Sequence, residues 1–235
     1  MFSARLKAIA QPVLTDIENH PFVRGIQAGA VPAAALMVYV EQDTCFLDAF
    51  AKVYAGALSK CTTKDQMRFF EEQIRYTLND EAGAHQILCD IAGQKLSDHQ
   101  HAEQRPITNL YNEHLFNALR TGDLIDLIAA MLPCPWTYTE ISQQIVNGAA
   151  PDNPFLPWIE FYQPQPGQID DSMVKTLFGM VDELAIGLSK ERQHEIEQRF
   201  LQSCELEYEF WEQAYYQKDW KYKNQAKRVS IKVNR

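Results

Sequence analysis

Residues 33–59, AAALMVYVEQDTCFLDAFAKVYAGALS, form a run rich in alanine, leucine and aromatic residues. Its apolar positions recur every three or four residues, which is the period of an α-helix, whereas a half-buried strand would alternate every two residues. Because apolar positions cover much of the helix circumference, the run predicts a helix that is buried on most sides. We therefore expect it to be the central helix of an all-α fold.

The same period continues on both sides of this run, in segments whose ends carry helix signals. Thr63 and Gln66 have capping-box spacing, and Asp170 or Asp171 and Ser189 are candidate caps of two later helices. The expected helices cover residues 3–18, 33–59, 63–91, 107–120, 122–130, 136–146, 171–188 and 189–220, with loops at 93–106 and 147–167. They predict one all-helical domain over residues 1–220 and a basic tail at 221–235, where residues 229–233 alternate like a short strand.

Composition and charge narrow the possible functions. The 235-residue chain is 46% hydrophobic, enough for a packed core, and its net charge of −9 disfavours nucleic acid as a partner. The sequence shows neither a run of about 18 apolar residues nor a signal-peptide pattern, so we expect a soluble cytoplasmic protein that does not enter membranes. Five widely spaced cysteines without a CxxC pair predict neither disulfides nor a structural zinc site.

The segment LPCPWTYTE at residues 132–140 brackets one cysteine, Cys134, between two prolines. Pro135 suits the first turn of a helix, which would place Cys134 at or just before the helix N-terminus. Unpaired amides and the helix dipole favour a thiolate there, as a nucleophile requires. Tyr138, four residues further on, would lie beside it. The alternative is that Cys134 is a small buried apolar residue.

Two carboxylates fall within apolar helical stretches. Asp43 lies in the central run, where it either joins a buried polar network or recognises a ligand amine or ring N–H. Glu207 lies about 200° around its helix from Glu205 and Glu209 and shares a face with Phe210. An inward Glu207 would have a raised pKa, which suits a general acid, and the alternative is a solvated charged face.

Other assignments compete for these groups. Glu81, His85, Glu41, Asp43, His114 and Glu207 are the carboxylates and histidines that a helical di-metal oxidase would use. None of these six residues form the Glu-x-x-His spacing of that class, which weighs against it. His20, ahead of a proline, is the single candidate haem ligand in the first segment.

Taken together, the chain resembles the TenA family, also called thiaminase II or aminopyrimidine aminohydrolase, over residues 5–220. The resemblance rests on motifs that occur in the family's order: HPFV at 20–23 with GI at 25–26, YV-x-QD at 39–43, FAK at 50–52, E-x-x-x-H at 81–85, LPC-x-W-x-Y-x-E at 132–140, NP-x-x-x-WI-x-x-Y at 153–162 and EY-x-FW at 207–211. Each motif is weak alone, and the ordered set is specific.

The resemblance implies a haem-oxygenase-like all-α bundle without haem, a homotetramer, and a hydrolase that needs no cofactor or metal. It implies cleavage of the bond between the methylene carbon of a 4-amino-2-methylpyrimidine and its nitrogen leaving group, in thiamin salvage. The expected substrates are 4-amino-5-aminomethyl-2-methylpyrimidine and thiamin. The roles it implies are nucleophile for Cys134, catalytic acid for Glu207, pyrimidine recognition for Asp43, and substrate binding for Tyr138, Tyr111, Tyr162, Phe46 and Phe210.

Two positions depart from the family pattern. Many members have tyrosine where this chain has Phe46, so the pocket lacks one hydroxyl, and Pro135 stands where other residues are common. A second function class therefore stays open, a non-catalytic or regulatory pyrimidine-binding protein. Replacement of Cys134 by serine separates the two classes, since only the hydrolase requires the thiol.

Overall fold

The computed structural model describes residues 1–79, 82–163 and 173–223, and its regular elements there are all helices. This confirms the predicted all-α class. The helices are α1 (Phe2–Asn19), α2 (Pro21–Ala28), α3 (Ala33–Leu58), α4 (Lys64–Asn79), α5 (Ala82–Ala92), the 3₁₀ turn η1 (Leu96–Asp98), α6 (Pro106–Thr121), α7 (Leu124–Met131), α8 (Pro133–Val146), α9 (Leu156–Phe161), α10 (Met173–Leu184) and α11 (Lys190–Tyr215).

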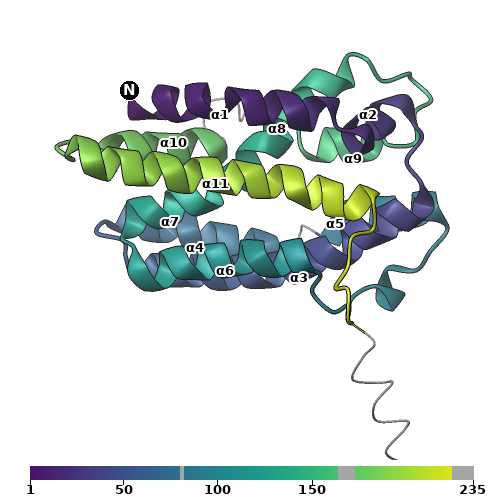
Figure 1. Cartoon of the computed structure of the whole chain (residues 1–235), viewed down its shortest axis with the longest axis horizontal. Coiled ribbons are helices and arrows are strands. Elements are labelled where there is room, and N and C mark those ends of the chain that lie inside the picture. The colour runs from purple at the N-terminus through teal and green to yellow at the C-terminus, as the bar shows by residue number, and fades with distance from the viewer. Residues whose placement is uncertain (80–81, 164–172, 224–235) are drawn as a thin grey trace, which may run out of the picture.

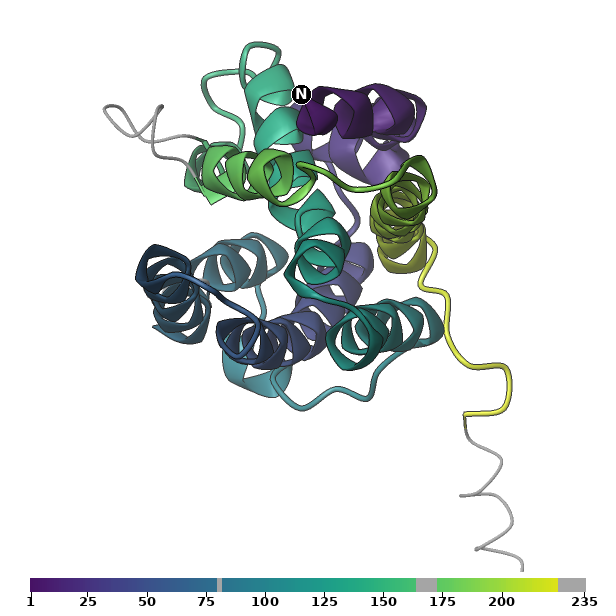
Figure 2. The same cartoon turned by 90° about the vertical axis from the view of Figure 1, so that its left-hand side faces the viewer.

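Helix α3 is the central helix that its apolar circumference predicts. It is buried along most of its length and packs against α4, α5, α6 and α11. Viewed from one end of the molecule, most helices are seen along their axes, so they run roughly parallel or antiparallel to one another (Figure 2). A helix in this position can present side chains to several neighbours at once.

Helix α11 runs along the middle of the molecule, with α1 on one side and α6 and α7 on the other (Figure 1). The predicted cap is confirmed, because the Ser189 hydroxyl accepts a hydrogen bond from the Arg192 amide. The helix ends at Tyr215 rather than at residue 220, as Gln217 adopts a left-handed φ of 55°. The following residues lie against the loop before α6, where Arg105 donates to the Gln217 carbonyl at 2.9 Å.

The junction of α7 and α8 differs from the prediction. Helix α8 begins at Pro133, and Leu132 joins it to α7 in right-handed helical geometry, so Cys134 is the second residue of α8 rather than a residue before it. The first amides of a helix have no partner within the helix, and two prolines therefore fit its first turn without losing a hydrogen bond. Cys134 keeps the predicted position among helix N-terminal amides.

Three other expectations have different outcomes. The capping box at Thr63 and Gln66 is confirmed by reciprocal bonds of 3.2 and 3.3 Å. The segment predicted as one helix over 63–91 is helical in α4 up to Asn79 and again in α5 from Ala82, and residues 80–81 between them lie outside the described residues. The loop predicted over 147–167 contains α9. The cap at Asp170 or Asp171 and the alternation at 229–233 lie outside the described residues.

No single described helix has the length and apolar character to cross a membrane, and α2 with α3 meets those criteria only as a pair bent by 115°.

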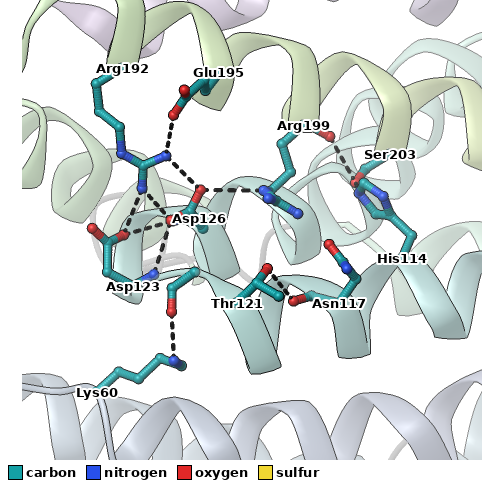
Figure 3. Close-up of polar contacts among 11 residues, drawn as sticks. Lys60, His114, Asn117, Thr121, Asp123, Asp126, Arg192, Glu195, Arg199 and Ser203 are labelled. Atoms are coloured by element: carbon teal, nitrogen blue, oxygen red, sulfur yellow. Dashed lines mark hydrogen bonds and ion pairs between the residues drawn. The ribbon is translucent and has the colours of Figure 1, made fainter.

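An ionic network fixes α7 against α11 (Figure 3). Asp126 in α7, 2% exposed, accepts hydrogen bonds from Arg192 and, at 3.3 Å, from Arg199, both in α11. Its carboxylate also closes a capping box with Asp123. Because α7 continues directly into α8, this network determines where the first turn of α8 lies relative to α11.

Candidate active site

Seven of the eight predicted site residues line one pocket between four helices. The cavity between them has a volume of about 10 Å³, far below the roughly 300–1,000 Å³ of pockets for drug-sized ligands. The lining side chains are Asp43 and Phe46 of α3, Tyr111 of α6, Cys134 and Tyr138 of α8, and Glu207 and Phe210 of α11. Tyr162, just after α9, is not part of this lining, and its ring packs against that of Tyr138 at 4.9 Å between centroids.

Glu207 is a buried carboxyl group with one hydrogen-bond donor. The Tyr111 hydroxyl donates to Glu207 Oε1 at 2.7 Å, and the Glu207 residue is only 3% exposed. Burial raises the pKa of Glu207 to about 8, with a further upward contribution from Asp43 and a downward one from the Tyr111 hydrogen bond. At neutral pH the group is therefore mostly protonated and can give up a proton, as a general acid must.

Cys134 lies in the same pocket, in the first turn of α8. Its charge contributes to the raised pKa values of Tyr111 and Tyr138, for which burial is the main cause, so both rings lie near the sulfur. Burial raises the pKa values of the other four cysteine thiols, Cys45, Cys61, Cys89 and Cys204. Cys134 is the cysteine whose surroundings, a helix N-terminus beside a pocket, suit a nucleophile.

Asp43 has a partner that sequence reasoning did not assign to it. His85 Nε2 of α5 lies 2.7 Å from Asp43 Oδ2, and both residues are buried. The two residues are 42 positions apart, and the signals in the sequence were that both belong to motifs of the resembled family and to the set of groups considered for a di-metal centre. The carboxylate oxygen not bound to His85 remains available to a ligand in the pocket.

Tyr138 likewise has a partner that was not predicted. Its hydroxyl lies 2.7 Å from the Tyr39 hydroxyl, and the Tyr39 ring stacks on Trp211 with centroids 5.4 Å apart. Tyr39 precedes Asp43 by four residues and so shares its face of α3, which is the signal that could have identified it. These contacts fix Tyr138 in one orientation at the pocket.

Aromatic rings form the apolar wall of the pocket. The Phe46 centroid lies 4.8 Å from that of Tyr111 and 6.1 Å from that of Phe210. The rings of Phe210 and Tyr39 are nearly perpendicular, with centroids 6.0 Å apart. Such a wall packs against the faces and edges of a planar ring. The pocket thus offers an apolar slot bordered by two carboxyl groups, two phenols and a thiol.

The described groups considered for a di-metal centre are engaged in contacts of their own, and two of them, Asp43 and His85, pair with each other. Glu41 contacts His99 at 2.9 Å and His114 contacts Ser203 at 2.9 Å, while Asp43 and Glu207 are bound as above. Among the described residues, which omit Glu81, no three histidine, cysteine or acidic side chains are arranged to hold a metal ion. His20 caps α2 through Nδ1 and contacts Glu212 through Nε2, so neither ring nitrogen is available for haem.

Comparison with known proteins agrees with these features. The sequence profile of the TENA/THI-4/PQQC family matches residues 7–218. An aminopyrimidine aminohydrolase of Halalkalibacterium halodurans is 33% identical over 224 residues, which cover 94% of this chain and 98% of that protein.

Solved structures show the same fold. A TenA family transcription regulator from Silicibacter sp. TM1040 aligns with a TM-score of 0.79 at 27% identity, covering 92% of this chain and 96% of that one. A domain of unknown function with a heme oxygenase-like fold from Shewanella denitrificans aligns with a TM-score of 0.63 at 15% identity, over 91% of this chain and 90% of that one. The predicted haem-oxygenase-like bundle is thereby confirmed.

Proposed function

The chain belongs to the TENA/THI-4/PQQC family, and from that premise we propose that it is an aminopyrimidine aminohydrolase. The reaction is hydrolysis of 4-amino-5-aminomethyl-2-methylpyrimidine to the hydroxymethyl pyrimidine and ammonia. Thiamin, whose pyrimidine carries the same methylene–nitrogen bond, is the second substrate. The observation that carries the proposal is that Cys134 and a mostly protonated Glu207 line one small pocket together with Asp43.

The reaction begins when the Cys134 thiolate adds to a ring carbon next to the carbon that bears the aminomethyl group. A C–S bond forms, and the ring nitrogens take up the displaced electron pair and a proton. The electron pair then returns through the ring and breaks the bond between the methylene carbon and the amine. Glu207 gives its proton to the amine, which leaves as ammonia.

Water completes the cycle. It adds to the exocyclic methylene carbon and loses a proton to the Glu207 carboxylate, which regenerates the acid. The C–S bond breaks as the ring nitrogen returns its proton, so the pyrimidine becomes aromatic again and Cys134 is released as thiolate. The net change is addition of one water and loss of one ammonia, with no oxidation or reduction.

The chemistry of the pocket lining supports a planar aromatic substrate. Phe46 and Phe210 offer its ring an apolar wall. Asp43 provides an acceptor for an exocyclic amino group. Because thiamin carries a second ring beyond the methylene–nitrogen bond, we expect the smaller aminomethyl pyrimidine to be the better substrate.

The test is ammonia release by the wild type and by Cys134→Ser, with thiamin assayed alongside. Cys61→Ser is the matched control, because Cys61 is also half-buried and its thiol donates to the Ala57 carbonyl, a bond that serine retains. We expect the wild type and Cys61→Ser to release ammonia and Cys134→Ser to lose nearly all turnover while still binding the product pyrimidine.

Other outcomes would contradict the proposal. Full turnover by Cys134→Ser would show that the thiol is not the nucleophile. Binding of pyrimidines without turnover by the wild type would favour the non-catalytic or regulatory pyrimidine-binding protein instead.

We further propose that residues 1–220 act as the catalytic unit of a cytoplasmic homotetramer in thiamin salvage. Large apolar side chains exposed on α4 and α6 support association, since Leu78 is 66% and Leu110 is 55% exposed. Light scattering on the purified protein tests this, and a monomer in solution would contradict it.

A further inference from the structure

Asp43 and His85 form a buried pair at the pocket, and the neighbours of this pair indicate where its protons lie. His85 Nε2 lies 2.7 Å from Asp43 Oδ2, and the two side chains are 5% and 10% exposed. On its other side, His85 Nδ1 lies 3.5 Å from Thr44 Oγ1. The hydroxyl proton of Thr44 is already donated to the Val40 carbonyl at 2.8 Å.

These partners assign the protons of the pair. Because the Thr44 proton is already donated, Thr44 Oγ1 can only accept from His85, and the 3.5 Å contact is satisfied when Nδ1 carries the N–H. In that tautomer a bare Nε2 would face a bare carboxylate oxygen at 2.7 Å, where two acceptors repel, so one further proton lies between Nε2 and Oδ2. In that state the pair holds one transferable proton.

We infer that His85 is a positioning residue of the site. Together with Asp43 it forms one proton-carrying unit for the amidine edge of the pyrimidine, which consists of the amino group and the ring nitrogen next to it. This inference rests on the proposed function. The unit accepts a hydrogen bond from the amino group and lends its proton to the ring nitrogen. That proton is the one that the ring takes up on thiol addition and returns when the C–S bond breaks.

Glu207 and Asp43 have different roles because their hydrogen-bond partners differ. Glu207 is bound to a phenol, Tyr111, which keeps its proton and only donates a hydrogen bond. Asp43 is bound to an imidazole, a group that can both accept and donate a proton. The site therefore holds two separate transferable protons, and the reaction needs two, one for the ring and one for the leaving amine.

His85→Gln is the variant that tests this inference. The glutamine amide can donate to Asp43 Oδ2 but cannot carry the transferable proton. We expect kcat to fall about a hundredfold, with KM and the dissociation constant of the hydroxymethyl pyrimidine product changed less than about threefold. His99→Gln is the matched control, because His99 also pairs with a carboxylate of α3, Glu41, at 2.9 Å, and lies outside the pocket lining. It should leave kcat unchanged.

A binding measurement separates proton transfer from structural support. Calorimetry would compare the product with an analogue that lacks the 4-amino group. The wild type and His85→Gln should both prefer the amino compound, whereas His85→Leu, which leaves Asp43 without its partner, should lose most of that preference. Unfolding curves of each variant show whether it is folded.

Three results would decide the matter. Wild-type turnover by His85→Gln would overturn the inference while leaving the hydrolase proposal intact. Undiminished preference for the amino compound in a folded His85→Leu would also overturn it. If the wild type releases no ammonia, the hydrolase proposal fails, and the His85→Leu preference still tests recognition of the amidine edge.

Discussion

The Tyr111 hydroxyl donates a 2.7 Å hydrogen bond to Oε1 of Glu207 inside the pocket. This contact opposes the effect of burial, because it stabilises the carboxylate form that burial disfavours. The pKa of about 8 for Glu207 is the net result. The pair thus sets the pH range in which Glu207 can act as an acid.

The pH dependence of turnover follows directly. If protonated Glu207 supplies the proton to the leaving amine, kcat should decline as pH rises through about 8. Tyr111→Phe removes a contact that lowers the pKa of Glu207, so its alkaline decline should shift to higher pH. Rate profiles between pH 6 and pH 10 measure this, with Tyr216→Phe, an exposed tyrosine, as control. A shift to lower pH in Tyr111→Phe would contradict the assignment.

The Glu207 carboxyl group should also make the stability of the folded protein depend on pH. In the unfolded chain Glu207 ionises near pH 4.3, whereas in the folded protein it keeps its proton until about pH 8. Between these values the folded state binds more protons, so the contribution of Glu207 to the free energy of unfolding declines as pH rises.

Glu207→Gln should abolish that decline. Its stability relative to the wild type should rise between pH 5 and pH 8 by at most about 1.4 kcal/mol per pH unit, measured by urea unfolding at each pH. Glu205→Gln, an exposed change on the same helix, should show no such trend. A stability difference independent of pH would mean that Glu207 is ionised in the folded protein.

Asp126 should change the pH dependence of the free energy of unfolding in the opposite direction. Burial alone would raise its pKa, but the Arg192 guanidinium and the Asp123 contacts outweigh burial and lower it. Its stabilising effect is therefore complete above the unfolded value of about 3.9 and is lost as pH falls below about 4. Asp126→Asn should cost about 3 kcal/mol at pH 7 and weaken this acid dependence. Asp65→Asn, in an exposed pair with Arg68, is the control and should change little.

The sequence predicted the parts of the molecule that depend on local pattern. The positions of α3 and α11 follow from helical periodicity and from the Ser189 cap. The buried side of Glu207 follows from its rotation away from Glu205, which is exposed in the structure. Local pattern made Cys134 a candidate nucleophile and Glu207 a candidate general acid, and the family resemblance favoured these roles over the alternatives. The roles remain proposals.

The contacts that were not predicted join residues far apart in the chain. Asp43 and His85 are 42 residues apart, and Tyr39 and Tyr138 are 99 apart. Each contact depends on how two helices are rotated against each other, which side-chain periodicity on one helix does not specify. The start of α8 was predicted at Pro135 or Trp136, whereas the helix begins at Pro133. A helix with prolines at two of its first three positions looks, from sequence, as if it starts at the second proline or after it.

Phe46 provides a test of the pocket's departure from the family pattern. It is 3% exposed and lines the pocket beside Tyr111. Phe46→Tyr adds a hydroxyl to a space that also contains Cys134, and a hydroxyl donor close to the sulfur stabilises its thiolate. We expect kcat to rise several-fold with KM little changed. The stability cost should stay within about 1–3 kcal/mol, the range for adding atoms to a packed core.

Phe50→Tyr is the matched control for this substitution. Phe50 lies one helical turn further along α3, and its ring stacks on Phe46 at 5.1 Å, but it is not part of the pocket lining. A hydroxyl added there meets a similar aromatic surrounding without reaching the sulfur, so kcat should not rise. If both variants changed kcat equally, the effect would come from repacking of the aromatic cluster. If Phe46→Tyr alone lowered kcat, the apolar wall itself, rather than a missing hydroxyl, would be what turnover requires at this position.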